Sequence, residues 1–167
     1  SKIEAGKMDY KFTSTNVEKL IEFVKLQQTN VAESKGLNLT THFDEKFVTV
    51  FADSSRLQQV LNNLLSNAIK FTNTGGTIDI STKVVDASEI HVPECFANEV
   101  KNLEGKYLQV CVSDDGIGIE EENLPKIFDQ FQQVESSLSR EVGGTGLGLP
   151  IVRKMLDAHN GAIWAES

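Results

Sequence analysis

Cysteine and histidine are scarce in this 167-residue chain, and no apolar run is long enough to cross a membrane. A membrane span needs roughly 20 consecutive apolar residues. The opening stretch SKIEAGKMDY also lacks the pattern of a secretory signal peptide. The two cysteines, Cys95 and Cys111, are too few for a disulfide scaffold, and neither they nor the histidines have metal-site spacing. A reducing cytoplasm is therefore the simplest setting, and Cys111, within an apolar run, is expected in the core.

Positive charge is also in short supply. Sixteen basic residues face twenty-four acidic ones, which gives a formal net charge of -8. Such a balance repels a phosphate backbone and excludes the basic stripe that nucleic-acid binding requires. Hydrophobic residues make up 40% of the chain, which is ordinary for a soluble globular domain, and the length favours a single domain.

Hydrophobic periodicity predicts alternating helices and strands. Helices are expected over 16–36, 53–71, about 124–131 and 150–160, and strands over 37–43, 47–51, 77–85, 106–113 and 162–167. Thr15 and Glu18 suggest a capping box for the first helix and Gly36 suits its C-terminal end, while the first two strands read as a hairpin. This order favours an α/β two-layer sandwich, with a mixed sheet and helices on one face. Residues 86–105 read as an insertion, either a surface loop elaboration or a docking surface for another domain.

One polar stripe follows the second predicted helix. Asn63, Asn67 and Lys70 are spaced i, i+4 and i+7, so they share a face. Asparagine is a poor helix former, about 0.5 kcal/mol worse than alanine, and a phosphate and metal site would explain its presence. An amide oxygen is a hard ligand suited to Mg²⁺, and a lysine neutralises phosphate oxygens. The alternative is a solvated polar face.

Two glycine-rich segments complete the pattern. SDDGIGI (113–119) follows an apolar strand, and its Asp114 offers a carboxylate to the amino group of adenine. The alternative is an ordinary Asp-Gly turn. GGTGLGL (143–149) precedes a helix, where glycines expose backbone N–H groups to phosphates. A P-loop, a dinucleotide-binding fingerprint and the HRD and DFG motifs of protein kinases are all absent from the sequence.

Together these segments resemble the ATP-binding catalytic domain of sensor histidine kinases, within the superfamily of Bergerat-fold ATPases. NNLLSNAIKFT is similar to the asparagine box, SDDGIGI to the first glycine box, IFDQF to the phenylalanine box and GGTGLGL to the second. SKIEAGKM resembles the end of a dimerisation helix, so residues 1–10 are assigned to that helix and 11–167 to the catalytic domain. The resemblance covers almost the whole chain apart from 86–105.

The resemblance implies a role for each matching residue. Asn67 is then the Mg²⁺ ligand, Asn63 positions phosphates or metal-bound water, and Lys70 contacts phosphate; these three are the catalytic candidates. Phe71 then lies near the nucleotide, and Asp114 binds the amino group of adenine. A lid over roughly 129–147 closes on the phosphates and is anchored by Phe128 and Phe131. The other nucleotide-binding residues implied are Gly116, Gly118, Ile119, Phe131, Arg140, Gly144, Thr145, Gly146, Leu147, Gly148 and Leu149.

Gln132 and Gln133 stand where many relatives carry a basic residue, so a lid arginine is not expected there. The stretch QQVESSLSREVGGTGLGL is similar to the lid of hybrid kinases, which places an arginine at Arg140.

The family's reaction transfers the γ-phosphoryl group of ATP to a histidine on a dimerisation domain, and then to an aspartate of a response-regulator receiver domain. No histidine here has the acceptor's context, so the chain alone is not expected to phosphorylate itself. Because dimerisation in this family belongs chiefly to the helices of the dimerisation domain, the chain is also expected to be monomeric. Two rivals are a nucleotide-sensing pseudokinase and an ATP-hydrolysing clamp. The clamp relatives carry a glutamate where this chain has Asn63.

Overall fold

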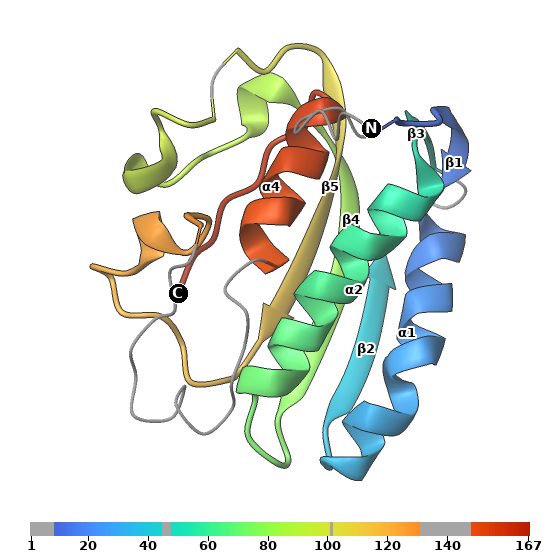
Figure 1. Ribbon diagram of the computed structural model, residues 1–167, viewed down its shortest axis with the longest axis vertical. Coiled ribbons are helices and arrows are strands. Elements are labelled where there is room, and N and C mark those ends of the chain that lie inside the picture. The colour runs from blue at the N-terminus through green and yellow to red at the C-terminus, as the bar shows by residue number, and fades with distance from the viewer. Residues whose placement is uncertain (1–8, 45–47, 101, 131–147) are drawn as a thin grey trace, which may run out of the picture.

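A layer of helices covers one face of a three-stranded sheet in this computed structural model, which describes residues 9–44, 48–100, 102–130 and 148–167 (Figure 1). The sheet has the order β2 (Asn38–Phe43), β4 (Thr77–Asp86) and β5 (Lys106–Asp114). β2 runs parallel to β4, and β5 runs antiparallel to it. The predicted mixed sheet with helices on one face is confirmed.

The first helix, α1 (Val17–Ser34), begins one residue later than the predicted capping box requires. Its N-cap is Asn16, whose side chain accepts a hydrogen bond from the Lys19 amide. Thr15 is not the cap because it lies in a short strand, where its hydroxyl donates to the Ala52 carbonyl. The predicted C-terminal end is confirmed, since Gly36 follows it with a φ of +69°.

The predicted hairpin of the first two strands is wrong. β3 (Thr49–Ala52) pairs antiparallel with β1 (Thr13–Asn16), a strand that the sequence did not predict, and the two form a separate sheet. β2 pairs with β4 instead. The alternating pattern of β2 identifies it as a strand but does not choose its partner, which is set by packing against the main core through Leu39 and Phe43.

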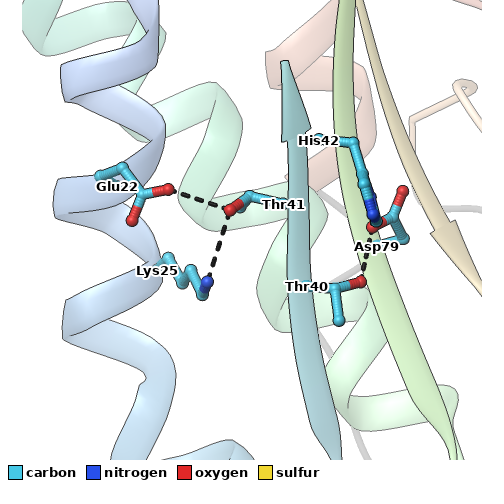
Figure 2. A network of polar contacts seen from close by, with 6 residues as sticks. All are labelled: Glu22, Lys25, Thr40, Thr41, His42 and Asp79. Carbon is cyan, nitrogen blue, oxygen red and sulfur yellow. Dashed lines mark hydrogen bonds and ion pairs between the residues drawn. The ribbon is translucent and has the colours of Figure 1, made fainter.

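Polar side chains reinforce both faces of β2 (Figure 2). On the helix side, the Thr41 hydroxyl donates to Glu22 of α1, with 2.9 Å between the oxygens. On the open side, one oxygen of Asp79 accepts from the Thr40 hydroxyl at 2.5 Å and lies 2.6 Å from Nδ1 of His42. His42 therefore has a structural role, in the contact between β2 and β4.

The second helix, α2 (Ser54–Phe71), forms as predicted and supplies the centre of the core. Leu61, Leu65, Ala68 and Ile69 are buried in the cluster between α1, α2 and the sheet. On another flank, Val60 packs against Val152 and Met155 of the last helix, α4 (Gly148–Ala158). The described part of α4 already includes Gly148, two residues before the predicted start at Pro150.

Three smaller expectations fail. Residues 161–167 form no strand; Ile163, Trp164 and Ala165 pack instead against a cluster around Phe128. The helical piece near 124–131 is, within its described part, the 3₁₀ turn η3 (Leu124–Lys126). Cys111 is exposed, because Leu108, Val110 and Val112 turn toward the helices and leave it on the open face of β5.

The expected insertion, 86–105, begins at the last residue of β4, and residues 87–105 connect β4 to β5 with the 3₁₀ helices η1 (Ala87–Glu89) and η2 (Glu94–Phe96). Phe96 is fully buried, and its ring makes a T-shaped contact with that of Phe128 at a centroid distance of 5.7 Å. The segment is therefore anchored in the domain by an aromatic side chain. Among the described helices, none combines the length and apolar character that a bilayer span demands.

The cap of α2 makes stability depend on pH. Oδ1 of Asp53 accepts from the Arg56 amide at 3.0 Å, and Oδ2 accepts from the Lys11 amide at 2.8 Å. The Lys11 hydrogen bond is the main cause that lowers the pKa of Asp53 below its usual 3.8. Because the folded pKa is the lower one, this stabilisation is present above the unfolded value and is lost as the pH falls below about 3.8.

We therefore expect the free energy of unfolding to fall on acidification, and to fall less steeply in Asp53→Asn, which keeps an acceptor oxygen but has no charge. Asp53→Ala should lose about 1 kcal/mol at neutral pH because it removes the cap. Urea unfolding of the three proteins between about pH 5 and pH 2 measures both effects. Parallel pH profiles for the parent and Asp53→Asn would contradict this explanation.

Candidate nucleotide-binding site

The three catalytic candidates lie together on α2. Asn63, Asn67 and Lys70 are all half-buried and follow one flank of the helix, away from the core residues Leu65 and Ala68. The ammonium of Lys70 lies 5.2 Å from the centroid of the Phe71 ring. The C-terminal half of α2 thus combines two amides, a cation and an aromatic ring on one surface.

The first glycine turn is bonded to the end of this helix. The Ile117 amide donates to the Phe71 carbonyl at 3.1 Å, and the Gly116 amide donates to Oδ1 of Asp114 at 2.9 Å. A Cβ at Gly116 would lie 2.4 Å from the Phe71 carbonyl oxygen, a contact that no side chain tolerates. Glycine is therefore required here for the turn to lie against α2. Asp114 is exposed at the end of β5, beside the turn.

The described end of the second glycine segment, at the start of α4, also lies close to α2. A Cβ at Gly148 would lie 3.1 Å from Oδ1 of Asn63, so the start of α4 contacts the side chain of the first asparagine. Leu149 and Ile119 contribute to the same hydrophobic cluster, around Phe96 and Phe128. The described ends of the two glycine segments therefore meet the asparagine helix at Asn63, near its middle, and at Phe71, its last residue.

The remaining predicted site residues either lie in the first glycine turn or fall outside the described residues. Gly118 is exposed in the same turn as Gly116, and the amide of Ile119 donates to the Ser167 hydroxyl at 2.7 Å. Outside the described residues lie Phe131, Arg140, Gly144, Thr145, Gly146 and Leu147, together with most of the expected lid and the segment SKIEAGKM.

Sequence reasoning missed Lys35. Its ammonium donates to the carbonyl oxygens of Ile69 and Lys70, at 2.6 and 2.9 Å. A cation at this place satisfies the last carbonyls of α2 and opposes the negative end of its dipole. The only local sign of this role is the position of Lys35 directly before Gly36, at the end of α1. That position does not predict a contact with α2.

Amide oxygens dominate the potential metal ligands of this site. Across the ranges that the structure describes, no three His, Cys, Asp or Glu side chains lie close enough to hold a metal ion. A hard cation at the stripe would accordingly be held by Asn67, aided by Asn63 and by oxygens of a bound phosphate, which is how Mg²⁺ is commonly bound beside nucleotides. The residues present fit Mg²⁺ in that manner.

We expect Gly116→Ala to destabilise the domain by about 1–3 kcal/mol, because the added methyl group forces the turn away from the Phe71 carbonyl. If Asp114 binds adenine, as the family resemblance implies, the affinity for ATP should fall as well, because Asp114 moves with the turn. Gly161→Ala is the matched control: its new Cβ makes ordinary contacts of 3.4 Å or more. Thermal unfolding and ATP titration of both variants measure these effects, and equal losses in the two would argue against the proposed close approach.

Comparison with known proteins identifies the family. Residues 52–167 match the family described as histidine kinase-, DNA gyrase B-, and HSP90-like ATPase. The hybrid signal transduction histidine kinase L of Dictyostelium discoideum is 38% identical over 169 residues, covering 100% of this chain and 9% of that protein. This chain spans between 9% and 28% of the length of four curated relatives that match it.

Solved structures agree with the family match. The nucleotide-free catalytic domain of the histidine kinase ThkA is 30% identical, with a TM-score of 0.71 over 94% of this chain and 88% of that one. ThkA in complex with the response regulator protein TrrA is 26% identical, with a TM-score of 0.66 over 93% of this chain and 38% of that chain. The chain therefore belongs to the histidine kinase-, DNA gyrase B-, and HSP90-like ATPases, and within them to the catalytic domains of histidine kinases.

Proposed function

We propose that this domain binds ATP with Mg²⁺ on the stripe of α2, between the two glycine segments, and transfers the γ-phosphoryl group to a histidine on a dimerisation domain outside this chain. The observation that carries the proposal is a pair of close approaches to α2: Gly148 lies close to Asn63, and the turn at Gly116 lies against Phe71. Asn67 and Lys70 lie on α2 between these two contacts.

Each residue then has a distinct task. Asn67 supplies the protein oxygen for Mg²⁺, Lys70 donates to phosphate oxygens, and Asp114 accepts from the adenine amino group. When bound, Mg²⁺ neutralises the charge that develops on the phosphate oxygens during transfer. The contribution of the domain is mainly to hold the nucleotide in position for the incoming histidine.

Asn63 favours transfer over hydrolysis. Activation of a water molecule requires a general base such as a carboxylate, and a neutral amide cannot accept that proton. Asn63 can instead orient phosphate or metal-bound water without activating it. This difference separates the proposed kinase from a clamp-type ATPase.

The proposed partners lie outside this chain. One is the dimerisation domain that bears the acceptor histidine, and the other is the receiver domain of a response regulator, the class of protein found with ThkA in its complex. We further propose that the reaction takes place in the cytoplasm and that the separate catalytic domain is monomeric.

Radiolabelled ATP and a purified dimerisation domain test this function. The catalytic domain alone should bind ATP with Mg²⁺ and acquire no stable phosphohistidine, whereas the added acceptor should be labelled and should pass the label to a receiver domain. ATP binding without labelled acceptor would indicate a pseudokinase. Rapid release of inorganic phosphate by the domain alone would indicate an ATPase. Either of these results would overturn the proposed transfer.

A further inference from the structure

The 87–105 segment, which carries none of the nucleotide-binding motifs, contacts the described elements that precede and follow residues 131–147 in the sequence. Its buried Phe96 packs on Phe128, which precedes that stretch. The carboxylate of Glu99 forms an ion pair with the guanidinium of Arg153, on α4, which follows the stretch. The segment 87–105 therefore contacts both the chain at Phe128 and the helix α4, which carries the end of the second glycine segment.

Arg153 also joins these two elements directly. Its guanidinium carbon lies 5.0 Å from the centroid of the Phe128 ring, within the range of a cation–π contact. The side chain of Arg153 is only 22% exposed, while that of Glu99 is 37% exposed. Such a partly buried pair is less screened by solvent than a surface pair, and the planar guanidinium has a preferred orientation toward both partners.

These contacts fix the orientation of α4. Val152 and Met155 pack toward Val60 of α2, whereas Arg153 is directed toward Phe128 and Glu99. Contacts in two directions prevent the helix from turning about its own axis. Gly148 lies five residues before Arg153 on this helix, about 7.5 Å along its axis, so any turn or slide of α4 moves Gly148 relative to Asn63.

We propose that Glu99 and Arg153 are positioning residues of the nucleotide site, which act through α4 to hold Gly148 against Asn63. The inference rests on the proposed function, because it assumes that the ligand of this site is ATP. It assigns to residues 87–105 a role in the reaction, in place of a passive connection between β4 and β5. Neither Glu99 nor Arg153 touches the nucleotide in this proposal.

Glu99→Gln and Arg153→Gln test it, alone and together. Each single variant should raise both the Kd for ATP and the KM for ATP in phosphotransfer about fivefold, with kcat at saturating ATP within about twofold of the parent. The double variant should bind ATP no more weakly than Arg153→Gln, because loss of Arg153 already breaks the pair with Glu99. Arg153→Lys, which keeps the charge without the planar group, should fall between the parent and Arg153→Gln.

The controls remove equal charges from neighbouring exposed positions. Glu94→Gln lies in the same segment and Lys154→Gln in the same helix, and both should leave ATP binding unchanged. An unaltered ATP affinity in Glu99→Gln and Arg153→Gln, an equal loss in the controls, or losses that multiply in the double variant would each overturn the proposal.

A second readout needs no nucleotide. In NMR spectra of the nucleotide-free protein, the side-chain amide signals of Asn63 should shift in Glu99→Gln and Arg153→Gln but not in the controls. Unmoved Asn63 signals would overturn the positioning role whatever the ATP data show. If the parent protein bound no ATP while these signals did shift, the proposed function would fail and the positioning of Asn63 would stand.

Discussion

Asn67→Ala is expected to lower the rate of phosphotransfer to the acceptor histidine by about two to three orders of magnitude. The side chain is half-buried on the stripe of α2, between the Asn63 contact with Gly148 and the Phe71 contact with the first glycine turn. Without it, α2 offers no amide oxygen between Asn63 and Lys70 on the stripe. The rate is measured with purified acceptor domain and labelled ATP at saturating Mg²⁺.

Measuring ATP binding with and without Mg²⁺ tests whether Asn67 acts as a ligand of the metal ion. Parent protein should bind ATP more tightly with Mg²⁺ than with a chelator present, and Asn67→Ala should lose most of that difference. Asn62→Ala is the matched control, because Asn62 lies on the same helix but points toward α1, where its amide oxygen accepts from Gln28 at 3.2 Å. A Mg²⁺ effect in Asn67→Ala equal to that of the parent would remove Asn67 from the proposed metal site.

Phe96→Ala should have the largest effect on stability, with a loss of about 3–5 kcal/mol in the free energy of unfolding. The ring is fully buried against Phe128, in a cluster that also contains Ile119 and Leu149. At about 2–4 °C per kcal/mol for a domain of this size, the melting temperature should fall by roughly 10 °C. Thermal unfolding followed by circular dichroism measures the change.

The neighbouring residue provides the control. Cys95 is exposed, so Cys95→Ala should change the free energy of unfolding by no more than about 0.5 kcal/mol. If Phe96→Ala were as stable as Cys95→Ala, the segment 87–105 would be a loosely attached loop, and the positioning role proposed for Glu99 would lose its support.

The sequence predicts the nucleotide-site helix well because its signals are local. The apolar face of α2 and the spacing of Asn63, Asn67 and Lys70 both depend on residues within a few turns of each other. The meeting of α2 with Gly116 and Gly148 was expected only through the family resemblance. Periodicity alone gives no distance between segments so far apart in the chain.

The errors concern contacts between distant residues. The sequence pattern predicts strands over 37–43 and 47–51, close to the observed β2 and β3, but it does not predict their partners, β4 and β1, which are set by which residues pack on the main core. The run around Cys111 looked buried because its neighbours are apolar, yet β5 turns this one residue to the open face. Lys35 has no motif at all, and its role depends on where α2 ends in space.

The strand partners of this domain also bear on how it folds. Between the paired strands lie residues 17–48 for β1 and β3, 44–76 for β2 and β4, and 87–105 for β4 and β5, so no described pair is a tight hairpin. Each pairing must close a long loop before its hydrogen bonds form, which makes sheet formation slow relative to helix formation. We therefore expect α1 and α2 to gain structure first, so that the helix bearing the nucleotide stripe serves as the template on which the sheet assembles.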